Sequence, residues 1–139
     1  EQVALDQFST PPELGVLAVL AAQVRPGDRV LEPSAGTGLL AVLAEACGGQ
    51  LTVNEWAAGR HGLLEGLVPR AGRSNHDAAH LPDLLTASGS FHVVLVNPPF
   101  QHLEAHLQTA LACVAAASDP SERMAKNLAA ALWATRSIR

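Results

Sequence analysis

The chain has 139 residues, 48% of them hydrophobic and 16% charged, with a formal net charge of −4. These values predict one compact domain with a single core, residues 1–139, and argue against an autonomous nucleic-acid binder, which needs a basic excess to neutralise phosphates. No apolar stretch is long enough to span a bilayer, and the two cysteines, Cys47 and Cys113, form no CxxC pair. We therefore expect a soluble, cytoplasmic protein with reduced cysteines and no membrane segment.

The first predicted element is a helix from Thr10 to about Gln23. Thr10-Pro11-Pro12-Glu13 combines a capping hydroxyl, a proline suited to the first helical position and a glutamate at the capping-box position. A turn over 25–28 leads into a short buried strand over 29–32. Residues 33–38 then form a glycine-containing loop, the glycine loop, and 39–47 a helix with a broad apolar face.

The alternation of strand and helix continues along the chain. Residues 51–54 have strand character, 57–67 helical character, and a weak third strand is predicted near 74–76. The unbroken apolar run 91–96 is the clearest strand, and helices are expected over 101–117 and from 119 onward. This order predicts an α/β fold with a parallel sheet covered by helices on both faces.

The glycine loop lies between a predicted strand and a predicted helix, a context typical of ligand binding. Gly36 and Gly38 would let the backbone approach a ligand closely. With Ala41 the pattern is also G-x-G-x-x-A, which a dinucleotide-binding protein can show, whereas no Walker-type G-K-[ST] follows. A tight strand-to-helix turn without a ligand is the structural alternative.

Two acidic residues follow predicted strands. Glu32 ends the first strand and Glu55 the second, close to the offset of about 20 residues at which an acid meets ribose hydroxyls. Carboxylates at these positions suit a cationic, hydroxyl-bearing ligand. The alternative for Glu55 is a solvated acid at a strand end.

A stiff loop follows the strand 91–96. In Asn97-Pro98-Pro99-Phe100 the prolines fix their own φ angles, and Pro98 favours an extended Asn97. The loop can present the Asn97 amide oxygen and the Pro98 carbonyl as fixed acceptors, with Phe100 as an apolar plate. An ordinary proline turn is the alternative.

These motifs together resemble those of a known family. Val30-Leu31-Glu32-Pro33-Ser34-Ala35-Gly36-Thr37-Gly38 resembles the first cofactor motif of class I S-adenosylmethionine-dependent methyltransferases. Asn97-Pro98-Pro99-Phe100 resembles the [DNS]-P-P-[YFW] motif of their amino-methylating branch, and Asp6-Gln7-Phe8-Ser9-Thr10-Pro11 is similar to the F-x-T-P element of N6-adenine enzymes. The resemblance covers residues 6–100. More loosely, the stretch resembles the methyltransferase segment of bacterial helicase-like proteins of the strawberry-notch type.

The resemblance implies a Rossmann-like methyltransferase sheet and a set of site residues. Glu32 and the glycine loop would hold the methionine part of S-adenosyl-L-methionine, Glu55 the ribose hydroxyls and Asp77 the adenine amino group. Asn97 and Pro98 would hold the target nitrogen. The implied cofactor-binding residues are Thr10, Glu32, Pro33, Ala35, Gly36, Gly38, Glu55, Asp77, Ala78 and Asn97, and the implied catalytic residues are Asn97, Pro98, Pro99 and Phe100.

The chain departs from the family after Phe100. Family members add three further strands, whereas 118–139 reads as helix. We therefore expect a sheet truncated after the fourth strand, a domain incomplete on its C-terminal side, and a segment of a longer protein, since the chain begins at Glu1. The exposed strand 91–96 predicts a homodimer or a partner domain that covers it.

The implied activity is N-methylation of an exocyclic amino group of a nucleic-acid base, with adenine favoured, or of a glutamine amide. A nucleic acid, DNA or RNA, would be gripped through additional domains. Two alternatives stay open: a nicotinamide-dependent oxidoreductase domain and a catalytically silent cofactor-binding or assembly module. His102 and His106 are four residues apart, but no third ligand accompanies them, so no metal is expected.

Overall fold

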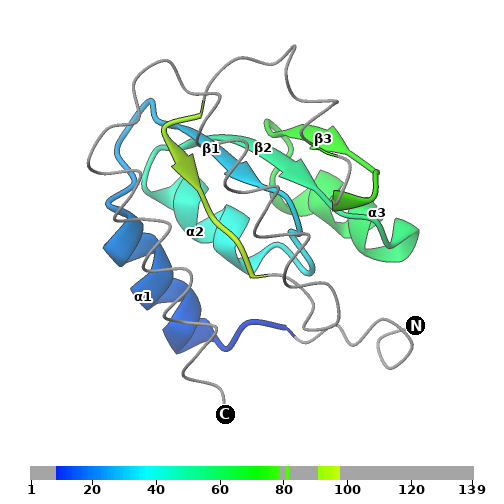
Figure 1. Cartoon of the computed structure of the whole chain (residues 1–139), viewed down its shortest axis with the longest axis horizontal. Helices are drawn as coiled ribbons and strands as arrows, with labels where there is room; N and C mark the ends of the chain where they lie inside the picture. Colours follow the sequence, from blue (N-terminus) through cyan, green and yellow to red (C-terminus); the bar gives the residue numbers. More distant parts are fainter. Residues whose placement is uncertain (1–8, 79–80, 82–90, 98–139) are drawn as a thin grey trace.

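In the described part of the chain, four parallel strands form one sheet, in the order β3-β2-β1-β4 (Figure 1). In the computed structural model the described residues are 9–78, 81 and 91–97. The strands are β1 Arg29–Glu32, β2 Gln50–Asn54, β3 Gly72–Ser74 and β4 Val93–Val94. Because neighbouring strands are parallel, their carboxyl ends lie at one edge of the sheet, where ligands bind in folds of this kind.

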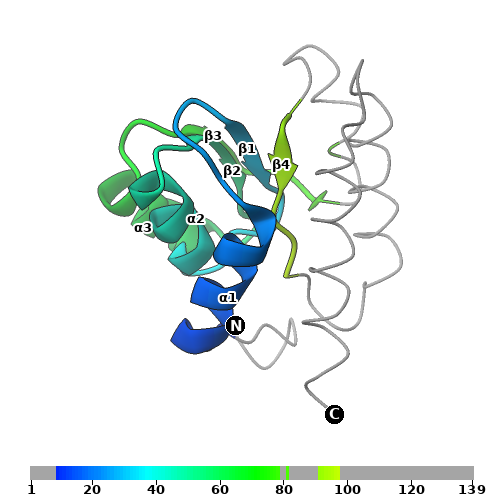
Figure 2. The same cartoon turned by 90° about the vertical axis from the view of Figure 1, so that its left-hand side faces the viewer.

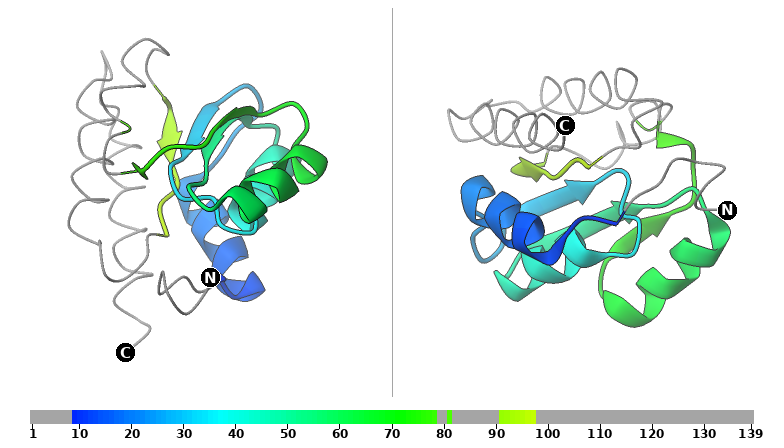
Figure 3. Two further views of the ribbon diagram at one scale, coloured as in Figure 1. Left: turned by 90° about the vertical axis from the view of Figure 1, so that its right-hand side faces the viewer. Right: turned by 90° about the horizontal axis from the view of Figure 1, so that it is seen from below.

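Three helices connect these strands or precede them: α1 Pro12–Ala22, α2 Leu39–Ala46 and α3 Ala58–Leu67. All three lie on one face of the sheet (Figure 2), and Figure 3 shows the helix layer beside the strand layer. None of the described helices is long and apolar enough to cross a membrane. The helices predicted over 101–117 and from 119 onward lie outside the described residues.

Both faces of the sheet are buried. The helix-covered face includes Val30, Val53 and Val93 from the strands, packed with Leu40 and Leu64 from the helices. The opposite face carries a second apolar cluster of Leu31, Ala78, Leu81, Phe91, Val94 and Val96. Burial on both faces explains why the strands contain near-continuous apolar runs rather than alternating ones. The parallel α/β sheet predicted from the sequence is confirmed.

The third strand begins two residues earlier than predicted. β3 covers Gly72–Ser74 rather than 74–76, because its register is set by pairing with β2, Thr52 opposite Gly72 and Asn54 opposite Ser74. Polar residues such as Arg73 and Ser74 are compatible with this strand, because the residues of β3 are exposed or only partly buried. The bounds of β1, α2, β2 and α3 agree with prediction to within one residue.

β4 is shorter than the predicted strand 91–96. Regular pairing with β1 is confined to Val30 opposite Val93 and Leu31 opposite Val94, with further bonds from His92 N–H to Arg29 O and from Leu95 N–H to Leu31 O, both at 2.8 Å. Among the described strands β4 is outermost, as predicted, and it leads directly to Asn97.

The N-terminus of α1 also differs from prediction. Pro11, not Thr10, is the N-cap, Pro12 is the first helical residue, and no side chain caps the helix, so the predicted capping box of Thr10 and Glu13 is wrong. Two successive prolines account for the shift, because each lacks an N–H that would need a cap. The Thr10 hydroxyl is used elsewhere, in a contact with Asn97.

Candidate functional site

The glycine loop is held by the carboxyl end of β2. Asn54 Nδ2 donates to Pro33 O at 3.0 Å, and Ala35 N–H donates to Asn54 O at 2.9 Å. Gly36 N–H then donates to Glu55 Oε2 at 2.7 Å. The loop is therefore bonded to Asn54, the last residue of β2, and to Glu55, the residue that follows it. These bonds fix the loop relative to β2.

The two glycines of the loop have different surroundings. Gly36 has φ 59°, and no atom of the described residues would lie within 4 Å of a Cβ placed there. Gly38, with φ 84°, is the N-cap of α2, and a Cβ there would lie 2.9 Å from Leu64 Cδ2 and 3.3 Å from Leu67 Cδ1. Gly36 therefore leaves open space for a ligand, whereas the space beside Gly38 is filled by α3.

Glu32 is a buried carboxyl at the end of β1. Its side chain is only 2% exposed, and Oε2 has no hydrogen-bond partner among the described residues. Burial raises the pKa of Glu32 well above its ordinary value of 4.5; a backbone hydrogen bond from Ala41 lowers it in part, and the charge of Glu55 raises it further. An unpartnered buried carboxyl oxygen is costly, and a cationic group bound beside it would relieve that cost.

Glu55 is bonded to backbone on both sides. Its Oε2 accepts from Gly36 N–H at 2.7 Å and its Oε1 from Ala57 N–H at 2.8 Å, and the residue is 3% exposed. The alternative of a solvated acid is therefore wrong. Each carboxylate oxygen can accept a second hydrogen bond, so the group retains capacity for hydroxyl donors.

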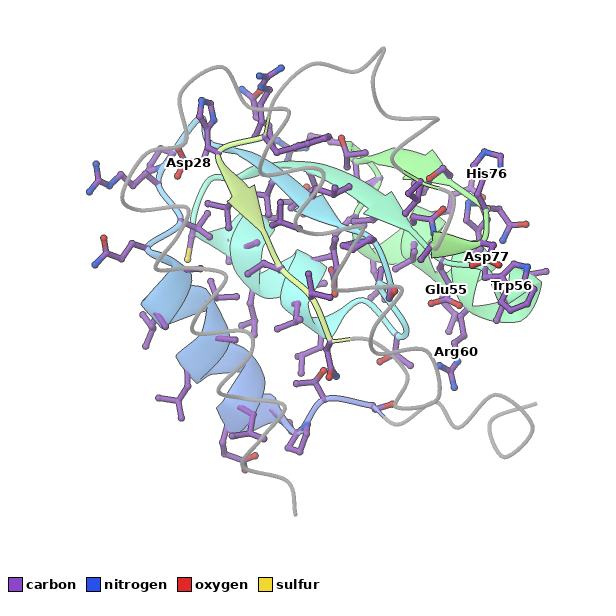
Figure 4. The ribbon with its side chains drawn as sticks, viewed as in Figure 1. Asp28, Glu55, Trp56, Arg60, His76 and Asp77 are labelled. Carbon is purple, nitrogen blue, oxygen red and sulfur yellow. The ribbon has the colours of Figure 1, made fainter. Side chains whose placement is uncertain are left out.

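Exposed and partly buried side chains lie near Glu55 at the ends of β2 and β3. Trp56 is 54% exposed. In Figure 4 the side chains of Glu55, Trp56, Arg60 and Asp77 project at this end of the sheet, whereas Asp28 lies at the opposite end. The structure thus brings Glu32, Gly36, Glu55 and Asp77 to one edge, as the sequence predicted. Ala78 is buried in the apolar cluster on the far face of the sheet, so its side chain contributes packing.

Asn54 was not identified from the sequence. It is 1% exposed, and its amide bonds to the loop after β1 and to the segment after β3. Its Oδ1 accepts from Ser74 Oγ at 2.8 Å and His76 N–H at 3.0 Å, and its Nδ2 donates to His76 O at 2.9 Å. The sequence signal is weak: a single asparagine between an apolar strand and an acidic residue.

Asn97 follows β4 at the same edge of the sheet. Its Nδ2 donates to Thr10 Oγ1 at 2.7 Å, which joins the segment before α1 to the segment after β4. The remaining residues of the predicted catalytic loop, Pro98, Pro99 and Phe100, lie outside the described residues, as do Cys113, His102 and His106. Within the described part of the chain, no group of three or more potential metal ligands occurs.

No family model and no curated protein matches the chain. Among solved structures, it is similar to TrmN from Thermus thermophilus (24% identity, TM-score 0.63, covering 80% of this chain and 35% of that chain). It is also similar to a candidate RNA methyltransferase from Pyrococcus horikoshii (22%, 0.64, 84% and 62%) and to Aeropyrum pernix fibrillarin with natively bound S-adenosyl-L-methionine (16%, 0.52, 88% and 64%).

The chain has the fold of S-adenosylmethionine-dependent methyltransferases. It spans less than two thirds of the length of these structures, from 35% of the Thermus protein to 64% of the Aeropyrum protein. In this fold the sheet edge that carries Glu32, Gly36 and Glu55 faces the ligand.

The methyltransferase fold implies S-adenosyl-L-methionine, and the residues present fit it. The unpartnered Glu32 Oε2 suits the cationic end of the cofactor, and the open space at Gly36 admits a ligand against the backbone. Glu55 can accept further hydrogen bonds from hydroxyls. An anionic pyrophosphate would instead meet the Glu32 and Glu55 carboxylates, which disfavours a dinucleotide.

Proposed function

We propose that the chain is the cofactor-binding part of an S-adenosylmethionine-dependent N-methyltransferase. The observation that carries the proposal is the pairing of two buried carboxyl groups, Glu32 and Glu55, around the open backbone at Gly36. This arrangement suits a ligand that carries both positive charge and hydroxyl groups. Support also comes from the fold and from a structure of that fold with S-adenosyl-L-methionine natively bound.

Each residue at this sheet edge would bind a different part of the cofactor. Glu32 would hold the cationic methionine end, and Glu55, fixed by Gly36 and Ala57, would accept from the ribose hydroxyls. Asp77 would accept from the adenine amino group. Since the glycine loop is bonded to β2 before any ligand arrives, little ordering is required on binding, which favours affinity.

The bound cofactor supplies an electrophilic methyl group on a sulfonium sulfur. The amide oxygen of Asn97 would accept a hydrogen bond from the target amino group. The lone pair of that nitrogen is otherwise delocalised and weakly nucleophilic. Transfer of the methyl group to the nitrogen would leave the electron pair of the carbon–sulfur bond on sulfur, and the nitrogen would release one proton to solvent. Positioning and electrostatics, rather than a strong base, would supply the catalysis.

The acceptor we propose is an exocyclic amino group of a nucleic-acid base, with adenine favoured over a glutamine amide. The basis is the asparagine at the end of β4 and the sequence resemblance of 97–100 to amino-methylating enzymes. One structure with a similar fold carries the name of an RNA methyltransferase. The net charge of −4 is unsuited to gripping nucleic acid, so we place that task in additional domains, in a cytoplasmic protein. A base within a duplex would have to be flipped out.

The outermost position of β4 supports a further element of this proposal. An apolar edge strand invites pairing, so we propose that a second copy or a partner domain covers it. Sedimentation of the chain at several concentrations checks the first version. A monomer at all concentrations would contradict the version with a second copy, and rapid amide exchange over 93–96 in the longer natural protein would contradict the version with a partner domain.

Calorimetric titration of the chain tests the cofactor assignment. Binding of S-adenosyl-L-methionine and S-adenosylhomocysteine, without binding of NAD⁺ or NADH, is the expected result. The reverse preference would establish the oxidoreductase alternative. Transfer of a labelled methyl group to RNA, DNA or protein by the longer natural protein then identifies the acceptor, and cofactor binding without transfer to any of them would indicate a silent module.

A further inference from the structure

We infer that Asn54 is a positioning residue, which holds the glycine loop and the segment 75–77 at a fixed separation for the cofactor between them. The inference rests on the proposed function. Asn54 itself would not contact the reacting groups. It acts through Gly36 and Glu55 on one side, and through Asp77 on the other.

The amide of Asn54 is fully bonded. Nδ2 donates to Pro33 O and His76 O, at 3.0 and 2.9 Å, while Oδ1 accepts from Ser74 Oγ and His76 N–H, at 2.8 and 3.0 Å. A primary amide has two donor hydrogens and two acceptor lone pairs, so its whole capacity is used. The orientation of the amide is also determined, because His76 N–H can only donate and Pro33 O can only accept.

The bonds of Asn54 extend the sheet beyond its regular end. The ladder between β2 and β3 stops at Asn54 opposite Ser74. Two residues later, the Asn54 side chain bonds both backbone groups of His76, in place of a further strand residue. Because the backbone of His76 is held, the backbone of the next residue, Asp77, is held in place as well. The same side chain of Asn54 also reaches the end of the neighbouring strand β1, at Pro33, where the glycine loop begins.

Burial makes this connection stiff. Asn54 is 1% exposed, so water does not replace a broken hydrogen bond, and each lost bond leaves an unsatisfied buried group. The backbone carbonyl of Asn54 adds a bond to Ala35 N–H at 2.9 Å. One residue thus ties together two segments that are far apart in sequence and that bind opposite parts of the proposed cofactor.

Two substitutions separate the bonds of Asn54 in the full 139-residue chain. Asn54→Ala removes all of the side-chain bonds, and we expect S-adenosylhomocysteine affinity to fall at least about tenfold. Asn54→Asp places an oxygen against both Pro33 O and His76 O, but the segment at His76 keeps one side-chain bond, from His76 N–H to the remaining acceptor, whereas Pro33 keeps none. We therefore expect amide exchange in the cofactor-free protein to accelerate more at Ala35 and Gly36 than at His76. A general loss of stability would accelerate exchange at all three alike.

Val53→Ala is the matched control. Val53 is fully buried in the same strand, and its side chain belongs to the apolar cluster on the helix-covered face and makes none of the hydrogen bonds of Asn54. It should lower the melting temperature, yet change the S-adenosylhomocysteine dissociation constant by less than about twofold. Titrations are performed below the melting transition of each variant.

The outcomes separate the two claims. If the parent chain binds neither S-adenosyl-L-methionine nor S-adenosylhomocysteine, the proposed function is wrong, and the positioning role falls with it. If the parent chain binds but folded Asn54→Ala binds equally well, only the positioning role is overturned. The same holds if Val53→Ala loses as much affinity as Asn54→Ala. Should Asn54→Ala fail to fold, uniform acceleration of exchange in Asn54→Asp overturns the role on its own.

Discussion

The side-chain nitrogen of Asn97 donates a hydrogen bond of 2.7 Å to the hydroxyl oxygen of Thr10, 87 residues earlier in the chain. This contact places the segment before α1 beside the carboxyl end of β4. With the nitrogen engaged by Thr10, the amide oxygen is the atom of Asn97 that can accept from a target amino group. The relationship gives Thr10 a role in holding the proposed catalytic side chain, in place of the helix-capping role that the sequence suggested.

Asn97→Ala should slow methyl transfer while leaving the cofactor site intact. Loss of one preorganised polar group in such a site costs on the order of 10²-fold in rate. The S-adenosylhomocysteine dissociation constant should stay within about twofold, because Glu32 and Glu55 are bonded independently of Asn97. Single-turnover kinetics in the longer natural protein, on its identified substrate, measure the rate.

Asn97→Asp is the informative comparison for this prediction. A carboxylate keeps an acceptor for the target, and the Thr10 hydroxyl can donate to it as well as accept. The rate should therefore lie between those of the parent and Asn97→Ala. Transfer by Asn97→Ala at the parental rate would show that the loop after β4 has no catalytic role.

The contact between Thr10 and Asn97 should appear as a coupling in stability. We expect the urea-unfolding free energies of Thr10→Val and Asn97→Ala to be non-additive in the double variant, by about 0.5–1.5 kcal/mol, the net value of one hydrogen bond. If Thr10 instead capped α1, the two substitutions would be independent. Ser9→Ala, at an exposed neighbouring position, serves as a control that should be additive with Asn97→Ala.

The elements that the sequence predicted well have local causes. β1, α2, β2 and α3 are bounded by turn residues and glycines, such as Gly48-Gly49, and their apolar patterns match their burial. The parallel sheet and the gathering of Glu32, Gly36 and Glu55 at one edge follow from the strand order alone. Such features depend on residues close in sequence or on the general geometry of parallel sheets.

The features that the sequence did not predict depend on tertiary pairing. The short extent of β4 is set by its pairing with β1, which an unbroken apolar run does not encode. The position of β3 is set by β2, and the role of Asn54 depends on backbone groups at Pro33 and His76, about twenty residues away on either side. Thr10 matched a capping motif, but two prolines and a distant asparagine determine its actual contact.

The two glycines of the loop should respond differently to substitution by alanine. Both have positive φ, which costs an alanine about 1–2 kcal/mol. At Gly36 the added methyl group enters open space, so Gly36→Ala should lose little beyond this amount while reducing S-adenosylhomocysteine binding at least about tenfold. At Gly38 the methyl group also meets Leu64 at 2.9 Å, so Gly38→Ala should be the less stable variant.

Urea unfolding and calorimetry of both alanine variants measure these effects. Gly62→Ala, an exposed helical glycine of α3 with open space around it, is a control that should not reduce stability or binding. Equal affinities of Gly36→Ala and the parent would show that the space beside Gly36 is not part of the cofactor site.

Glu32→Gln should stabilise the cofactor-free chain at pH 8 and weaken its binding of S-adenosyl-L-methionine. Burial, and to a lesser extent the charge of Glu55, raises the pKa of Glu32 above 4.5 in the folded state. The folded protein therefore retains this proton to a higher pH than the unfolded chain does. The stability of the parent falls as the pH rises from 4.5 towards the raised pKa, and above it the full cost of ionisation is present. Glutamine, being neutral at every pH, avoids that cost.

The advantage of Glu32→Gln should accordingly shrink as the pH is lowered and become small near pH 4.5, where the folded carboxyl of the parent is protonated and the unfolded one is about half protonated. Urea unfolding at pH 8 and pH 4.5 measures the difference; groups other than Glu32 titrate in both proteins and largely cancel. Binding should change in the opposite direction, because an ionised hydrogen bond contributes about 1.5–3 kcal/mol, which corresponds to roughly tenfold to a hundredfold in the S-adenosyl-L-methionine dissociation constant. A stability advantage that is equal at both pH values would mean that Glu32 is not ionised at pH 8, and unchanged affinity would show that its carboxyl does not hold the cofactor.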